Sequence, residues 1–255
     1  MPPLEMRVLV GPTDESSFEN TGGRQIFEGL VPAICYESVL DIGSGCGRLA
    51  RQLMLQNPRP QRYLGFDPHR GMVQWCQQHL TLAAPSFEFV HQDIDCPFNP
   101  GSDKPQILPF PTATPATLMI ATSVYTHLFA DQTVFYLTET RRLLAPGGRA
   151  VTTWFLFDKR YFPFMQESQN ELFINRFDPW NAVIYDRAWL LATIAACSLR
   201  LVRVVPPAVR GHQWMLVLAR DDDDQPPVSL PDQDDAPFGL ARAGSIASPE
   251  KVTAP

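Results

Sequence analysis

The sequence lacks the features of metal-binding, disulfide-stabilised or membrane-spanning proteins. Its five cysteines are an odd number and include no Cys-x-x-Cys pair, which argues against a disulfide framework or a zinc site. No His-x-x-His pair or acidic cluster occurs within residues 1–220, so we expect no metal. No apolar run is long enough to cross a bilayer, and the first residues do not follow the pattern of a signal peptide. We therefore expect a reduced, cytoplasmic protein with no membrane partner.

The sequence also lacks an excess of positive charge. Its 255 residues carry a net charge of −6, and residues 221–255, with eight acidic and two basic side chains, account for all of it. The rest of the chain is neutral and offers no electrostatic attraction to nucleic acid, so we expect no nucleic-acid partner. Residues 221–255 are acidic, rich in Pro, Ser and Ala and poor in apolar residues, which predicts a disordered tail.

Apolar segments alternate with helical patterns between residues 23 and 220, and this rhythm is typical of an α/β domain with a doubly wound, mostly parallel sheet. The length suits one such domain, preceded by an arm at residues 1–22. A helix is expected over 23–33. The turn at 206–211 is too short for a crossover helix, so the last strand should run antiparallel to its neighbour. The seven expected strands cover residues 38–42, 62–66, 87–90, 118–122, 149–157, 199–205 and 213–219.

Residues 158–185 interrupt this rhythm with a segment dense in aromatic side chains. One interpretation is that the rings form a substrate lid over a planar or sugar ligand. The other, which we favour, is that they form a hydrophobic lid and core.

The most informative stretch is a buried strand followed by glycines at alternate positions, Gly43, Gly45 and Gly47. A dinucleotide-binding turn requires a glycine at the position of Arg48. Asp41, two residues before the first glycine, is also poorly suited to a pyrophosphate because it adds negative charge. It suits a ligand that carries an ammonium and a sulfonium.

This stretch resembles motif I of the class I S-adenosylmethionine-dependent methyltransferases. The blocks 65–67, 123–128 and 143–149 match as well, and the resemblance extends from about residue 11 to residue 220. Within the class the chain looks closest to the small bacterial type 11/12 enzymes. The resemblance implies a Rossmann-like, seven-stranded sheet with an antiparallel last strand, and S-adenosyl-L-methionine as cofactor.

Three aspartates, 26 residues apart each time, close the first three expected strands. The carboxyl ends of such strands converge on one crevice. The resemblance implies that Asp41 lies near the methionine ammonium, that Asp67 accepts hydrogen bonds from the ribose hydroxyls, and that Asp93 accepts one from the adenine amino group. Arg24 is a weaker candidate for the cofactor's carboxylate. The predicted cofactor-binding set is Asp41, Gly43, Ser44, Gly45, Gly47, Asp67, Pro68, Met72, Asp93, Ile94 and Ser123.

The sequence says less about the methyl acceptor. We expect a small-molecule or sugar hydroxyl, for which His127 is the leading candidate base, since histidine accepts protons near neutral pH. Alternatively, His127 caps a helix or binds a backbone carbonyl. His212 is a weaker candidate, and Asp158 and Tyr185 flank the aromatic segment and are placed to contact an acceptor.

Four other functions remain open at this point. They are a regulatory protein that binds S-adenosylmethionine without catalysis, an aminopropyltransferase on the same fold, an NAD-dependent oxidoreductase, and a glycine turn that binds nothing. The aminopropyltransferase would need more acidic residues than the loop at 95–116 carries, and Arg48 disfavours NAD. The sequence does not address the oligomeric state.

Overall fold

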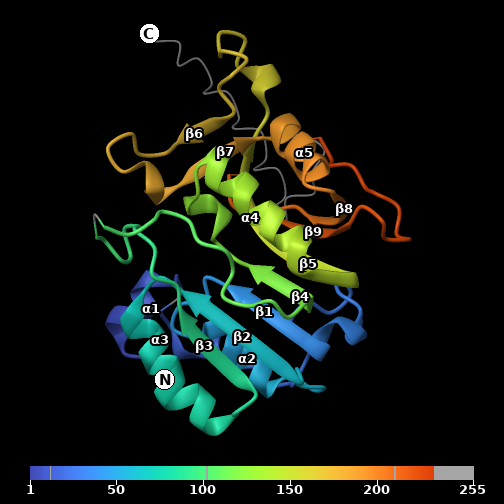
Figure 1. Cartoon of the computed structure of the whole chain (residues 1–255). Coiled ribbons are helices and arrows are strands. Elements are labelled where there is room, and N and C mark those ends of the chain that lie inside the picture. Colours follow the sequence, from blue (N-terminus) through green and yellow to red (C-terminus); the bar gives the residue numbers. More distant parts are fainter. Residues whose placement is uncertain (12, 102, 210, 233–255) are drawn as a thin grey trace, which may run out of the picture.

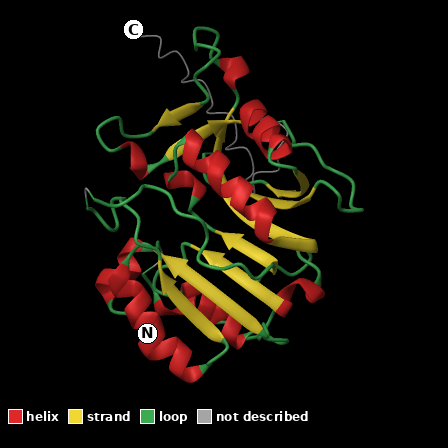
Figure 2. Cartoon of the chain, viewed as in Figure 1, coloured by secondary structure: helices red, strands yellow, loops and turns green. Residues whose placement is uncertain are grey.

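The computed structural model describes residues 1–232 except residues 12, 102 and 210. It has a mixed α/β fold, in which helices flank a central sheet (Figures 1 and 2). The helices are α1 (Leu4–Leu9), α2 (Arg48–Leu55), α3 (Arg70–Cys76), α4 (Ala130–Leu143) and α5 (Arg187–Ala196). The strands are β1 (Ser38–Ile42), β2 (Arg62–Asp67), β3 (Phe87–His91), β4 (Ala116–Ala121), β5 (Leu144–Phe157), β6 (Glu171–Phe173), β7 (Val183–Asp186), β8 (Leu199–Val205) and β9 (Trp214–Arg220).

The sheet runs in the order β3-β2-β1-β4-β5-β7-β6, which can be followed in Figure 1 from its lower to its upper edge. Strands β1 to β5 pair in parallel. Strand β9 pairs antiparallel with both β5 and β8. The predicted doubly wound, mostly parallel sheet with a reversed last strand is therefore confirmed.

Strand β5 is longer than its neighbours and has different partners along its length. Residues 150–154 pair with β9, whereas residues 155–157 pair in parallel with β7. Strands β7 and β6 come from the aromatic segment and pair antiparallel with each other. This segment, for which the sequence predicted no strands, therefore extends the sheet beside the carboxyl end of β5.

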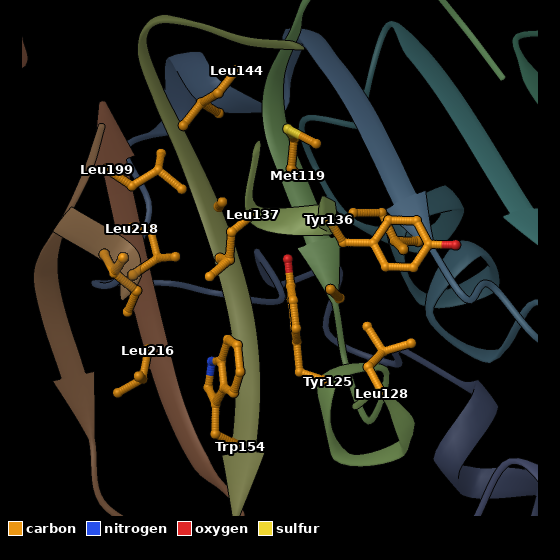
Figure 3. Packing of buried hydrophobic residues seen from close by; sticks show 14 of the residues in the cluster. Met119, Tyr125, Leu128, Tyr136, Leu137, Leu144, Trp154, Leu199, Leu216 and Leu218 are labelled. Carbon is orange, nitrogen blue, oxygen red and sulfur yellow. The ribbon is translucent and has the colours of Figure 1, made fainter. Parts of the chain in front are cut away.

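The side chains of the central strands alternate between two hydrophobic clusters, one on each face of the sheet, as the period of a β-strand requires. Leu40 and Met119 lie in the cluster that α4 and α5 cover. Val39 and Leu118 lie in the cluster that α2 and α3 cover. Figure 3 shows part of the first cluster, including Leu137 of α4 and Leu216 of β9, together with strand side chains. Both faces are buried, so the functional groups must gather at the ends of the strands.

The expected helix over 23–33 is not formed. The chain makes turns there instead, followed by a 3₁₀ helix at Ala33–Glu37. Gly29 has a φ of +76° and Pro32 follows it, and both features end an α-helix. The preceding arm carries the short helix α1, and its Val10 and Phe18 pack with Cys46 and Met72. The arm therefore lies against the glycine turn.

Residues 221–232 also differ from the expected disorder. Arg149 makes an ion pair with Asp223 at 2.8 Å between Nη1 and Oδ2, and both side chains are buried. Val228 N donates to Leu201 O, and Arg187 donates to Pro231 O. Composition missed these contacts because they depend on partners far away in the chain. Residues 233–255 of the predicted tail lie outside the described residues.

None of the helices that the structure describes is long and apolar enough to cross a membrane. Among the same residues, no three His, Cys, Asp or Glu side chains come together as a metal site would require.

Candidate active site

A cavity of about 540 Å³ lies at the carboxyl ends of β1, β2 and β4. This is the edge at which open α/β sheets bind ligands. Its walls include the turn between β1 and α2, the segments at 66–72 and 122–128 that follow β2 and β4, the arm at residues 9–11, the loop at 92–98, and residues 174–182 of the aromatic segment. The fold therefore brings two inserted segments and the arm onto the glycine turn that the sequence singled out.

The glycine turn has a backbone that only glycine adopts readily. Gly43 and Gly45 have φ values of +69° and +54°, in the left-handed region. A Cβ on Gly43 would lie 2.6 Å from Val124 Cγ2, and one on Gly45 would lie 2.6 Å from Val10 Cγ1. Both residues line the cavity, whereas Gly47 does not. Gly47 instead faces Leu80 and Cys76, so its role is to seat α3 against the turn.

Asp41 lines the cavity from the end of β1 and is almost fully buried. The Tyr63 hydroxyl donates a hydrogen bond of 2.5 Å to its Oδ2. Burial raises the pKa of Asp41 to about 7, a shift that the Tyr63 bond and Arg48 partly offset and that Asp67 adds to. A cationic group in the cavity would favour the ionised form of this carboxyl.

Asp67 holds the turn in place from the end of β2. Its Oδ2 accepts a hydrogen bond from Gly45 N and its Oδ1 accepts one from His69 N, both at 2.8 Å. Burial raises the pKa of Asp67, and these backbone bonds act against that shift. Each carboxylate oxygen has a further lone pair, so Asp67 can still accept hydrogen bonds from a ligand in the cavity.

Two further groups on the turn are available to a ligand. The Ser44 hydroxyl is buried at the cavity and has no hydrogen-bond partner among the described residues, which a buried polar atom normally finds. Arg48 also lines the cavity. In the sequence Arg48 only disfavours NAD, but in the structure it is also a candidate partner for a ligand carboxylate.

The wall of the cavity that is expected to hold the adenine ring is mostly apolar. Pro68, Met72 and Ile94 line the cavity as predicted. Asp93 does not line it, because its carboxylate pairs with Lys104 at 3.0 Å and accepts from Asn99 at 2.9 Å. These two contacts lower the pKa of Asp93, the Asn99 hydrogen bond most. The neighbouring residue, Gln92, lines the cavity instead.

The other end of the cavity contains His127 and Ser123. His127 Nδ1 lies 2.6 Å from the carbonyl oxygen of Trp180. A carbonyl only accepts hydrogen bonds, so this nitrogen carries the proton and Nε2 of the neutral ring has a free lone pair. Ser123 has a φ of +58°, a conformation that concentrates at functional sites. Gln213 donates to its hydroxyl at 3.0 Å.

Four weaker candidates do not reach the cavity. Tyr185 is buried and its hydroxyl donates to Leu128 O at 2.5 Å. Asp158 binds the guanidinium of Arg160. Neither these residues nor His212 and Arg24 are among those that line the cavity. The sequence did not indicate Gln213, Trp180 and Phe98, which do line it, because their positions depend on contacts with residues far away in the chain.

Several solved structures share this fold. The O-methyltransferase NcsB1 of neocarzinostatin biosynthesis has a TM-score of 0.50 at 13% identity, over 72% of this chain and 49% of that one. The mitomycin 7-O-methyltransferase MmcR has a TM-score of 0.50 at 15% identity, over 80% and 53%. The magnesium protoporphyrin IX methyltransferase of Synechocystis PCC 6803 has a TM-score of 0.48 at 16% identity, over 72% and 69%.

The matched region spans about half the length of NcsB1 and of MmcR. At these identities the similarity is one of fold, which is the Rossmann-like fold of the methyltransferases. The match to a sequence family adds to this similarity of fold. Residues 39–148 match the sequence model of a family described as a methyltransferase domain. Residues 39–148 therefore form a methyltransferase domain, consistent with the class I S-adenosylmethionine-dependent enzymes that the sequence resembles.

Proposed function

We propose that this methyltransferase transfers its methyl group to the hydroxyl of a small molecule or sugar, with His127 as the general base. The observation that carries the proposal is the single cavity that contains both the glycine turn and His127. NcsB1 and MmcR, which share the fold, are named as O-methyltransferases, in agreement with a hydroxyl acceptor.

The residues of the turn fit S-adenosylmethionine. When ionised, Asp41 and Asp67 supply two negative charges at the cavity, and Arg48 supplies one positive charge, which complements a ligand with an ammonium, a sulfonium and a carboxylate. We assign the ammonium to Asp41, the carboxylate to Arg48 and the ribose hydroxyls to Asp67. The free Ser44 hydroxyl supports the same site.

The adenine would then lie against Pro68, Met72 and Ile94. Its amino group does not go to Asp93, whose carboxylate is engaged with Lys104. Gln92 is buried and lines the cavity at that place, but its amide nitrogen already donates to the carbonyls of Leu108 and Pro109. These bonds orient the amide so that its oxygen is left to accept a hydrogen bond from the adenine amino group.

The cofactor supplies an activated methyl group, so the chain's own residues chiefly provide position and a base. The bond from His127 Nδ1 to the Trp180 carbonyl fixes the tautomer that a base needs, with Nε2 unprotonated. Such a base typically contributes about 10²–10⁴-fold to the rate. The aromatic segment thus positions the ring that removes the acceptor's proton.

The test has a binding arm and a turnover arm. Titration calorimetry of the full chain should show binding of S-adenosylmethionine and S-adenosylhomocysteine but not of NAD. Labelled S-adenosylmethionine incubated with a cell extract should then give a labelled product that is a methyl ether.

His127→Gln should lower that labelling at least 10²-fold and leave the affinity for S-adenosylhomocysteine unchanged. Binding without any methyl ether, or a His127→Gln variant with full turnover, would contradict the proposed role. His79→Gln, a change outside the cavity, is the matched control.

A further inference from the structure

The charged side chains of the cavity are confined to the end that we assign to the cofactor. Among the described residues that line it, the acids and the arginine are Asp41, Asp67 and Arg48, all on the glycine turn or at the strand ends beside it. The rest of the lining, which we call the acceptor end, includes Phe98, Ser123, Thr126, His127, Phe155, Ile174, Trp180, Asn181 and Gln213. An acceptor with a permanent charge would find no counter-charge there, and burying an unpaired charge is costly.

The polar side chains of the acceptor end are largely engaged with one another. Gln213 donates to Ser123, and His127 Nδ1 donates to the Trp180 carbonyl. A sugar presents many hydroxyls, each of which needs a partner when it is buried. The groups left to a ligand are His127 Nε2, the side-chain amide of Asn181 and the Thr126 hydroxyl, which is buried without a partner in the described part of the chain. These few groups can serve one acceptor hydroxyl but not the many hydroxyls of a buried sugar.

The apolar surface of the acceptor end is aromatic and partly open to solvent. Phe98, Phe155 and Trp180 line it. Phe98 is 41% exposed, and its ring lies edge-on to His127 with the centroids 6.0 Å apart. Ile174, also on the lining, is 63% exposed. Apolar side chains that line a cavity yet remain exposed are the surface that a planar ligand would cover, since rings pack edge-on or offset against other rings.

We propose that the acceptor is an uncharged planar aromatic compound with one hydroxyl, docked against Phe98 with that hydroxyl at His127. This inference rests on the proposed function and narrows its substrate class. In the reaction, the phenolic oxygen gives its proton to His127 Nε2 and bonds to the methyl carbon, while the methyl–sulfur bond breaks and its electron pair stays on sulfur. The products are an aryl methyl ether, S-adenosylhomocysteine and a protonated histidine.

The test uses 2-naphthol and methyl α-D-glucopyranoside as probes, each titrated by calorimetry into the full chain saturated with S-adenosylhomocysteine. We expect 2-naphthol to bind and the glucoside not to bind. Phe98→Ala should weaken naphthol binding about 3- to 10-fold, the range of one aromatic contact, without changing the affinity for S-adenosylhomocysteine. Phe164→Ala is the matched control, because this ring is 99% exposed and lies outside the cavity lining.

Failure of the two proposals can be told apart. A chain that does not bind S-adenosylhomocysteine would contradict the cofactor site and the function built on it. A chain that binds S-adenosylhomocysteine but prefers the glucoside, or binds naphthol equally well after Phe98→Ala, would overturn the aromatic acceptor alone. Formation of 2-methoxynaphthalene from labelled S-adenosylmethionine, lost in His127→Gln while naphthol still binds, would support both.

Discussion

Asp41 is a buried carboxyl whose proton is tied to the stability of the fold. Its pKa in the folded chain is about 7, against about 4 in an unfolded chain. Between these pH values the folded state therefore holds a proton that the unfolded state has lost. The free energy of unfolding must then fall as the pH rises through that window. The cost arises because the ionised carboxylate is desolvated without a cationic partner.

The prediction is made for Asp41→Asn, which keeps the side-chain shape and cannot ionise. Relative to this variant, the ligand-free chain should lose on the order of 4 kcal/mol of unfolding free energy between pH 4 and pH 8. Urea unfolding at several pH values measures the difference. Parallel curves for the two proteins would show that Asp41 does not titrate in this range.

The same carboxyl should make cofactor affinity depend on pH. If Asp41 binds the ammonium group, S-adenosylhomocysteine should bind more tightly as the pH rises toward 7, by up to about tenfold per unit, and then level off. 5′-Methylthioadenosine lacks the amino-acid part, so the ratio of the two affinities isolates Asp41 from Asp67.

Tyr63→Phe tests the cause of this dependence. It removes the hydroxyl that donates to Asp41, so the pKa of Asp41 should rise and the levelling-off point of the affinity ratio should move to higher pH. Tyr36→Phe is the control, because its hydroxyl accepts from Phe27 N outside the cavity. An affinity ratio that does not change with pH would contradict the assignment of the ammonium group to Asp41.

The turn between β1 and α2 depends on glycine at Gly45 for two reasons, its left-handed φ and the closeness of Val10 Cγ1. Gly45→Ala should therefore cost about 1–2 kcal/mol for the backbone and also displace the arm from the turn. Gly147→Ala is the matched control. Its φ is +73° and a Cβ there would meet nothing within 4 Å, so it carries the backbone cost alone.

We expect both variants to be less stable in thermal unfolding and only Gly45→Ala to bind S-adenosylhomocysteine more weakly. Calorimetry below the melting temperature of each variant makes the comparison. Equal affinities in the two variants would mean that the contact between Gly45 and Val10 has no part in the cofactor site.

The elements that the sequence predicted well are those whose signals are local. The strand, glycine turn and helix around Gly43 were recognised because buried apolar runs and alternate glycines act within a few residues. Strands β6 and β7 were missed because their pairing depends on the end of β5. The predicted site followed the same division. Asp41 and Asp67 line the cavity, whereas Gln92 lines it in place of Asp93, whose carboxylate is engaged with Lys104 and Asn99 from the following loop.

At the scale of the whole molecule, the chain after β9 returns across the sheet edge as a strap, residues 221–232. The Arg149–Asp223 pair fixes it to β5, and Arg149 Nη2 also donates a hydrogen bond of 3.0 Å to Gln225 Oε1. Composition indicated disorder because it records acidity and not the distant arginine. Burial alone would raise the pKa of Asp223. The hydrogen bond from the backbone N–H of Gln225 and the contact with Arg149 outweigh burial, so the pKa is lowered. This contribution to stability is present at neutral pH and is lost as the pH falls below about 4.

Asp223→Ala should therefore cost about 3 kcal/mol of unfolding free energy at pH 7, because it leaves the Arg149 guanidinium buried without its counter-ion. Asp224→Ala, one residue along and exposed, should cost far less than 1 kcal/mol.

A chain that ends at residue 232 should keep the full stability, and one that ends at residue 220 should lose at least as much as Asp223→Ala. Urea unfolding of the four proteins at pH 7 measures these differences. As the pH falls below about 4, the difference between the Asp223→Ala chain and the unmodified chain should shrink, because the unfolded state then gains a proton that the folded Asp223 still resists. Equal stability of the chains that end at 220 and 232 would show that the strap lies on the domain without stabilising it.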